Sequence, residues 1–192
     1  MPGVSFWTIR HSSATTHSAT IGAWIRLGFE LDRPLLTEVA EKAGFTNEGG
    51  FGGGVRFLRN IMGLWMLQCI RHEQNDQLSF AQMAELALHG EAYPYTVNVS
   101  DPRFMAPPSM TEAVRAALRE QGAPEPPDTG ALLRCVTQSL AHAYADALRH
   151  LETLTGTRYD ALHIVGGGQH HAVVVIGMIA ADFRAPGGAD HH

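Results

Sequence analysis

The sequence has few of the features that mark disulfide-rich, membrane-spanning or secreted proteins. It contains only two cysteines, Cys69 and Cys135. Both lie inside helical patterns, so we expect small, buried, reduced thiols rather than a disulfide framework. The longest apolar run, Ala172 to Ala181, is far below the ~20 residues that a membrane helix needs. The N-terminus lacks the long apolar core of a signal peptide, and we expect a soluble, cytoplasmic protein that binds no membrane.

Charge is sparse as well. Charged residues make up 17% of the chain, its net charge is −5, and its 14 Lys and Arg residues are scattered. A nucleic-acid footprint needs basic residues clustered on one face, so we expect no nucleic-acid partner. Apolar residues, in contrast, make up 45% of the 192 residues. This composition supports a buried core, and the length suits one domain or a large piece of a bigger protein.

The hydrophobic pattern predicts helices and strands in an α/β layered domain. Loose alternation predicts a strand over Ile21–Asp32, and a short helix opens at Pro34 and closes near Gly44. The glycine-rich stretch 46–54 is expected to be a loop, followed by a helix from about Phe57 to His72. Further helices are expected over Ser79–Leu88, over Met110–Glu120 with Ser109 as N-cap and Glu112 in a capping box, and from Asp128 to about Leu154, with Gly156 as its C-terminal stop.

A last strand, Ala161–Val165, ends in three glycines, Gly166, Gly167 and Gly168. In open α/β sheets ligands lie at the carboxyl ends of strands, and glycine there lets a ligand approach the backbone. A tight turn is the simpler alternative, and the Lys-Ser/Thr ending of a phosphate-binding P-loop does not follow. The residues alone therefore indicate a candidate nucleotide or substrate loop.

Four motifs carry a resemblance to a known family. The runs TNEGG, RNIMGLW, VNVSDPRFMAPPSM and LHIVGGG, in this order, resemble the C-terminal half of the L-rhamnulokinase branch of the FGGY sugar kinases. The resemblance covers residues 21–168, leaving 1–20 as a divergent N-terminal segment and 169–192 as a divergent tail. It implies an incomplete actin-like ATPase (ribonuclease H-like) domain, with a mixed sheet and flanking helices.

The resemblance also implies an activity. Such kinases transfer a phosphoryl group from ATP, with Mg²⁺, to the 1-hydroxyl of L-rhamnulose. Gly166, Gly167 and Gly168 match the loop that lies against the adenosine. Gly22, Ala23 and Trp24 match a Gly-Thr-Trp motif that faces the phosphates, with Ala23 in place of the threonine. A charge-assisted phosphate contact contributes roughly 1.5–3 kcal/mol, so we expect weaker nucleotide binding.

Other departures from the family argue against activity in this chain alone. The family's catalytic aspartate lies shortly before the Gly-Thr-Trp strand, but this chain has no Asp before Asp32, and His11 and His17 have no support as substitutes. No catalytic residue is therefore assigned, and L-rhamnulose is expected to bind only with a separate N-terminal domain. The alternative is a non-catalytic binding or dimerising module, or a pseudogene product. The divergent ends fit either a disturbed or truncated reading frame or a shortened paralogue.

Several polar groups have two interpretations. Asn47 and Glu48 either face the cleft or organise a turn, and both remain open. Asn98, Asp101 and Arg103 fit a structural role in a proline-bounded turn, and Met62, Trp65 and Met66 fit the core. The histidines of the tail predict no metal site, because adjacent histidines diverge. The apolar tail AVVVIG and an uncovered strand edge make self-association a further expectation.

Overall fold

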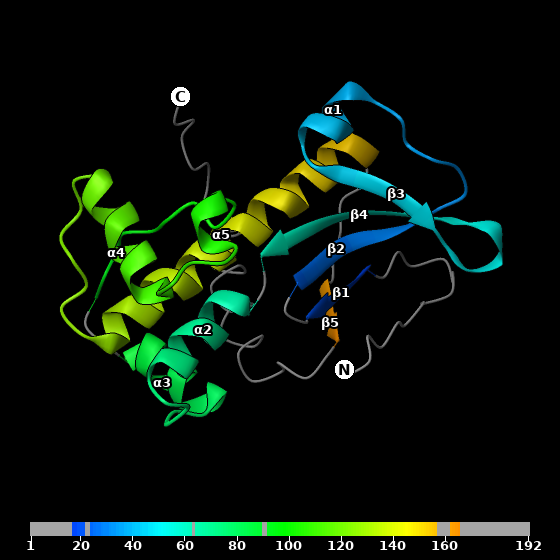
Figure 1. The fold of residues 1–192 in the computed structure, drawn as a ribbon. Helices are drawn as coiled ribbons and strands as arrows, with labels where there is room; N and C mark the ends of the chain where they lie inside the picture. Colours follow the sequence, from blue (N-terminus) through cyan, green and yellow to red (C-terminus); the bar gives the residue numbers. More distant parts are fainter. Residues whose placement is uncertain (1–16, 22–23, 63, 90–91, 157–161, 166–192) are drawn as a thin grey trace. The chain divides into compact units, whose positions relative to one another are not determined.

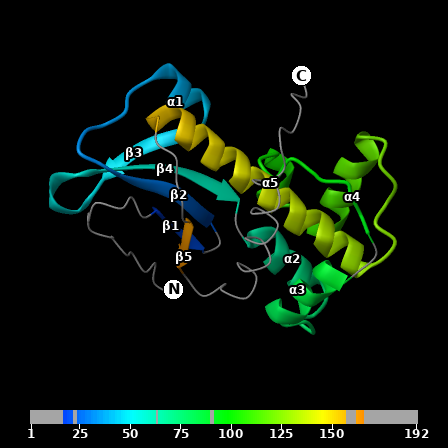
Figure 2. The same cartoon turned by 180° about the vertical axis from the view of Figure 1, so that it is seen from behind.

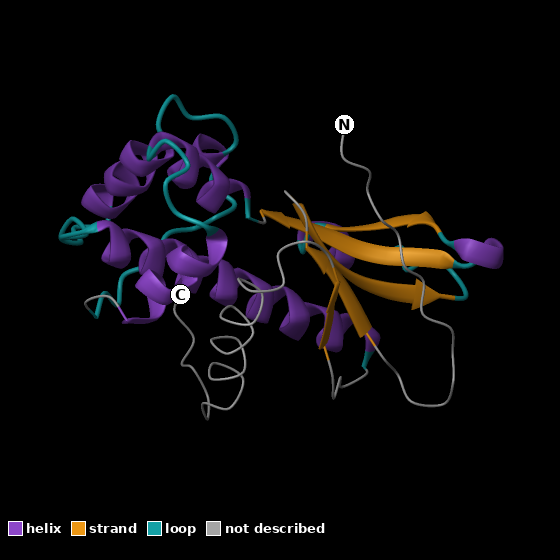
Figure 3. Cartoon of the chain, turned by 90° about the horizontal axis from the view of Figure 1, so that it is seen from below, coloured by secondary structure: helices purple, strands orange, loops and turns teal. Residues whose placement is uncertain are grey.

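The computed structural model describes residues 17–21, 24–62, 64–89, 92–156 and 162–165. Its contacts divide the chain into two units. The sheet unit comprises Met1–Trp65 and Asp146–Gln169, and the helical unit comprises Met66–Ala145 and His170–His192. The longest helix, α5 (Thr129–Thr155), begins in the helical unit and ends in the sheet unit. In Figure 3 the strands are orange and the helices purple.

Five strands form one mixed sheet in the order β3-β4-β2-β1-β5. They are β1 (His17–Ile21), β2 (Trp24–Leu31), β3 (Phe45–Gly49), β4 (Val55–Met62) and β5 (Leu162–Val165). Every neighbouring pair is antiparallel except β1 and β5, which run parallel. Figures 1 and 2 show the sheet from two sides, with β1 between β2 and β5. The predicted mixed sheet is therefore present.

The helix predicted from Phe57 to His72 is wrong over its first part, which forms the strand β4. In the structure residues 55–62 are extended, and α2 (Trp65–Glu73) begins only after them. Phe57, Leu58 and Ile61 are all buried, because β4 is an inner strand that pairs with β2 and β3. An inner strand covered on both faces loses the alternation that marks a half-buried strand, so its apolar run resembles a helix.

Four further elements of the sheet unit differ from expectation in their bounds. The strand β1 lies in a segment without periodicity, and TNEGG belongs mostly to β3 rather than to a loop. The loop is shorter and centres on the 3-10 turn η1 (Phe51–Gly53), where Gly52 and Gly53 have φ of 66° and 87°. Helix α1 (Glu38–Lys42) starts after the N-cap Thr37, and the predicted stop at Gly44 has φ of 74°.

The helices of the helical unit follow their predicted caps closely. In α3 (Phe80–His89) the Ser79 hydroxyl accepts from Gln82 N–H at 3.2 Å, and the Gln82 side chain accepts from Ser79 N–H at 2.8 Å. Ser109 caps α4 (Met110–Glu120), and Asp128 accepts from Ala131 N–H at 2.7 Å to cap α5. Gly156 follows α5 with φ of 65°, as a C-terminal stop requires.

The core of the helical unit includes an apolar stripe along α5, with residues spaced three and four apart. Its buried members are Leu132, Val136, Leu140 and Tyr144, and the stripe continues into the sheet unit with Ala147 and Leu151. The stripe's last member, Leu154, is only half-buried. Met66 is fully buried as predicted, but Trp65 is 36% exposed, so the core assignment was wrong for this tryptophan. Among the helices of the described part, none is long and apolar enough to cross a membrane.

Candidate functional site

The parallel pairing of β1 with β5 brings two glycine-bearing motifs to one edge of the sheet. Thr20 lies opposite Val165, so both strands end at this edge. The chain continues from Ile21 into Gly22 and Ala23, and from Val165 into Gly166. These motifs, separated by most of the chain, therefore begin at the ends of neighbouring strands. Gly22, Ala23, Gly166, Gly167 and Gly168 themselves lie outside the described residues.

Trp24 is the one residue of the Gly22–Trp24 motif that the structure describes. It opens β2, where its backbone lies opposite Met62, the last residue of β4. The ends of β1, β4 and β5 and the start of β2 thus share one edge. Backbone amides that emerge after parallel strands, next to residues without bulky side chains, are suited to binding a flat or anionic ligand.

Asn47 and Glu48 lie away from this edge. Asn47 pairs with Phe57, five residues along β4 from Met62, and β3 is two strands from β2. At ~3.3 Å per residue and ~4.8 Å between strands, Asn47 lies roughly 20 Å from the backbone of Trp24. Glu48 is one residue farther along, opposite Arg56. The register therefore does not bring Asn47 and Glu48 together with the glycine motifs.

The contacts of Asn47 give it a structural task. Its Oδ1 accepts from Leu35 N–H at 3.0 Å, and its Nδ2 donates to the Leu35 carbonyl at 3.0 Å. The amide thus pairs with a backbone unit as a neighbouring strand would, and ties the segment before α1 to β3. Asn47 makes this contact from within β3 rather than from a turn.

The polar group at residues 98–103 also acts locally. Asp101 caps the 3-10 turn η2 (Pro102–Phe104) by accepting from Arg103 N–H at 2.9 Å. The Arg103 guanidinium donates to both carboxylate oxygens of Glu120, at 2.9 and 2.7 Å. The hydrogen bond from Arg103 lowers the pKa of Glu120, and its own pKa is raised in turn. This group holds a turn in place, as predicted.

The described residues offer no cluster of three or more His, Cys, Asp or Glu side chains placed to hold a metal ion. Sequence reasoning missed β1, the strand that brings the two glycine motifs to neighbouring strand ends. Its residues, His17–Ile21, lack alternation, and its place depends on pairing with β5 more than 140 positions away. Pairing over such a distance leaves no local signal in the sequence.

The fold of the chain has a counterpart among solved structures. It matches the crystal structure of xylulose kinase from Bifidobacterium adolescentis with a TM-score of 0.55 and 17% sequence identity, over 85% of this chain and 31% of that one. At this identity the likeness concerns the fold alone. It agrees with the mixed sheet and helices described above.

The sequence comparisons then define the family. Residues 17–182 match the C-terminal domain of the FGGY family of carbohydrate kinases, and the chain belongs to this family. The match includes β1 and passes Gly168, so it is wider than the resemblance over 21–168.

Two curated relatives are rhamnulokinases. That of Ligilactobacillus salivarius (strain UCC118) is 40% identical over 153 residues, which are 80% of this chain and 32% of the relative. That of Enterobacter sp. (strain 638) is 43% identical over 147 residues, 77% of this chain and 30% of the relative. The chain thus spans about a third of the length of each relative.

Proposed function

We propose that this chain is the ATP-binding part of a sugar kinase of the L-rhamnulokinase type, which phosphorylates L-rhamnulose at O1. The observation that carries the proposal is the parallel register of β1 and β5, because it brings both glycine motifs to neighbouring strand ends. Two rhamnulokinases at 40% and 43% identity support the choice of sugar. In this proposal the sheet is that of an actin-like (ribonuclease H-like) ATPase, with antiparallel β1, β2 and β4 and a parallel β5.

The proposed roles of the glycine motifs follow from the family resemblance. Gly166, Gly167 and Gly168 would lie against the adenosine, and the backbone amides of Gly22 and Ala23 would face the phosphates. Bound ATP supplies the phosphoryl group. Mg²⁺ would be held by the phosphates together with waters and one or two carboxylates, as is common for this ion.

By itself the chain is proposed to hold the nucleotide without transferring its phosphoryl group. Phosphoryl transfer depends on positioning of both substrates and on a residue that accepts the hydroxyl proton. No Asp precedes Asp32, so the position of the family's catalytic carboxylate is not filled. The sugar and its aligning contacts would come from an N-terminal domain.

The test is a thermal-shift titration of the full chain with Mg-ATP and with Mg-ADP. A ligand that binds only the folded state stabilises it by about 2.7 kcal/mol at a hundredfold excess over Kd, so we expect a saturable rise in Tm. Gly167→Trp should abolish the rise, and the exposed Lys42→Ala should keep it. Ala23→Thr should tighten binding roughly tenfold or more. No shift with the wild-type chain, or an equal shift with Gly167→Trp, contradicts the proposal.

The second candidate is a non-catalytic module that binds another protein or itself. Two apolar side chains beside and on α1 favour it, because Leu36 is 84% and Val39 61% exposed. Sedimentation of the wild-type chain and of Leu36→Ser with Val39→Ser tests this candidate. A dimer that the double variant loses supports it, and a monomer at all concentrations excludes self-association through this helix.

A further inference from the structure

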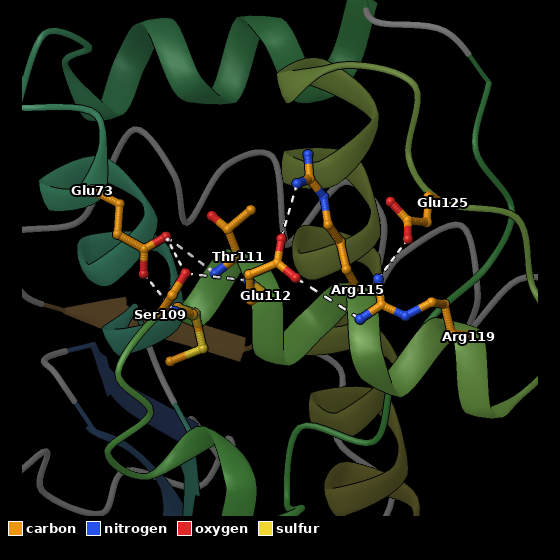
Figure 4. A network of polar contacts seen from close by, with 8 residues as sticks. Glu73, Ser109, Thr111, Glu112, Arg115, Arg119 and Glu125 are labelled. Carbon is orange, nitrogen blue, oxygen red and sulfur yellow. Dashed lines mark hydrogen bonds and ion pairs between the residues drawn. The ribbon is translucent and has the colours of Figure 1, made fainter.

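The last residue of α2 is an acid where helix electrostatics favours a base. Glu73 follows Arg71 and His72 in the last turn of α2, at the negative end of the helix dipole. Figure 4 shows its side chain extending to the start of α4. The role of this carboxylate therefore lies in α4 rather than in its own helix.

The Glu73 carboxylate accepts from three donors at the N-terminus of α4. Oε2 accepts from Thr111 N–H at 3.1 Å and from the Ser109 hydroxyl at 3.3 Å, and Oε1 accepts from Met110 N–H. The Ser109 hydroxyl accepts in turn from Glu112 N–H at 3.3 Å. The first three amides of α4 thus all have acceptors, two of them from Glu73. A side chain of α2 completes the cap of another helix.

Glu112 does not take this place. The capping-box pattern directs its carboxylate back toward Ser109, but it pairs instead with Arg115 at 3.1 Å and with Arg119 at 3.8 Å, farther along α4. Figure 4 shows Glu73 and Glu112 on opposite sides of the first turn. The cap therefore combines a local bond to Ser109 with contacts from another helix.

The segment before α4 is fastened near both ends of that helix. Arg103 holds Glu120 at the C-terminal end, and Glu73 holds Ser109 and the first amides at the N-terminal end. Helix α4 is ~15 Å long at ~1.5 Å per residue. Residues 104–109, which we call the strap, join these two points and begin with the last residue of η2. Pro107 and Pro108 restrict its backbone further.

We propose that Glu73 is the latch of this strap: its carboxylate fastens the first turn of α4 to α2, and its removal frees the strap and that turn while the helices stay folded. Burial acts to raise the pKa of Glu73, but the hydrogen bonds from Thr111, Met110 and Ser109 outweigh it, so the net pKa is lowered. The Cys69 thiol lies close enough on α2 for Glu73 to raise its pKa, while α4 presents uncharged hydroxyl and amide donors.

The test is residue-resolved amide hydrogen exchange of the full chain at neutral pH, in the wild type, Glu73→Gln and Glu112→Gln. Loss of one charged acceptor corresponds to about a tenfold change, so Glu73→Gln should accelerate exchange at Met110 and Thr111 about tenfold. Glu112→Gln removes the same charge from the same turn and should leave both rates unchanged. Amides of α5, such as that of Leu140, should not respond to either variant. Equal acceleration in the two variants, or equal acceleration in α5, overturns the proposal.

A comparison within the wild-type chain needs no variant. Thr111 and Ala81 are the second residues of α4 and α3, and the α3 cap is formed by Ser79 and Gln82. Thr111 should exchange more slowly than Ala81, because Glu73 holds it. Exchange of Thr111 as fast as that of Ala81 would show that the latch is not closed in solution.

Discussion

Gly28 lies in β2, opposite Leu58 of β4. A Cβ atom built on it would lie 2.2 Å from the Phe57 carbonyl oxygen and 2.6 Å from Leu58 Cβ, both closer than real contacts allow. We expect Gly28→Ala to lower the free energy of unfolding by about 1–3 kcal/mol, the usual effect of overpacking a core. Chemical denaturation measures it.

Gly49 provides the matched control for Gly28. It also lies in a strand of the sheet, and a Cβ there would meet nothing within 4 Å. Gly49→Ala should leave stability unchanged or raise it slightly. If both variants lost the same stability, backbone effects rather than the close approach of β2 and β4 would be responsible.

The two thiols should differ in reactivity. Burial raises the pKa of Cys135 to about 12, although its hydrogen bond with Ser139 acts the other way. Burial, followed by the charge of Glu73, also raises the pKa of Cys69, but this side chain is only half-buried. Because the thiolate is the reactive form, a thiol reagent at pH 8 should modify Cys69 slowly and Cys135 only after unfolding. Rapid modification of Cys135 in the native chain would contradict the packing of α5.

At the scale of the element, the latch predicts a pH dependence. The pKa of Glu73 is lower in the folded chain than its ordinary value of 4.5. Its contribution to stability is therefore present above pH 4.5 and is lost as the pH falls through the lower, folded value. Unfolding free energies measured between pH 7 and pH 3 should decline less steeply for Glu73→Gln than for the wild type. Parallel curves would show that Glu73 does not carry this dependence.

The elements also show what the sequence could predict and why. Helix ends were predictable where a cap is local, as with Ser79, Ser109 and Asp128, because donor and acceptor lie within three residues. The inner strand β4 was not, because burial on both faces removes its alternation. The latch at Glu73 was not either, since its partners lie 36 to 38 positions away. Only the folded chain reveals contacts of that range.

At the scale of the whole molecule, we expect a bound nucleotide to protect the sheet unit from hydrogen exchange more than the helical unit. If ATP binds at the edge formed by β1, β2 and β5, protection from exchange should rise in peptides covering residues 17–31 and 162–165. Peptides from α3 and α4 in the helical unit should change far less, because ligand binding protects most strongly the segments that it touches. Uniform protection along the chain would indicate that ATP stabilises the molecule without a defined site.

One part of the candidate site was predictable from the sequence, and another part was not. The family resemblance identified the glycine motifs from the sequence alone, and the family match includes them. It could not place Asn47 and Glu48, whose distance from the edge follows from the register of three strands. A motif fixes the order of residues along the chain, whereas a sheet fixes which of them become neighbours.

The pairing of β1 with β5 has a consequence for how the molecule is made. Residues 20 and 165 are partners, so their meeting closes a loop across 145 positions, and long loops close slowly. On the ribosome β1 lacks its parallel neighbour until residue 165 has been synthesised. The edge proposed to bind ATP is therefore the last part of the sheet to be assembled, and a nascent chain cannot hold the nucleotide before synthesis has passed β5.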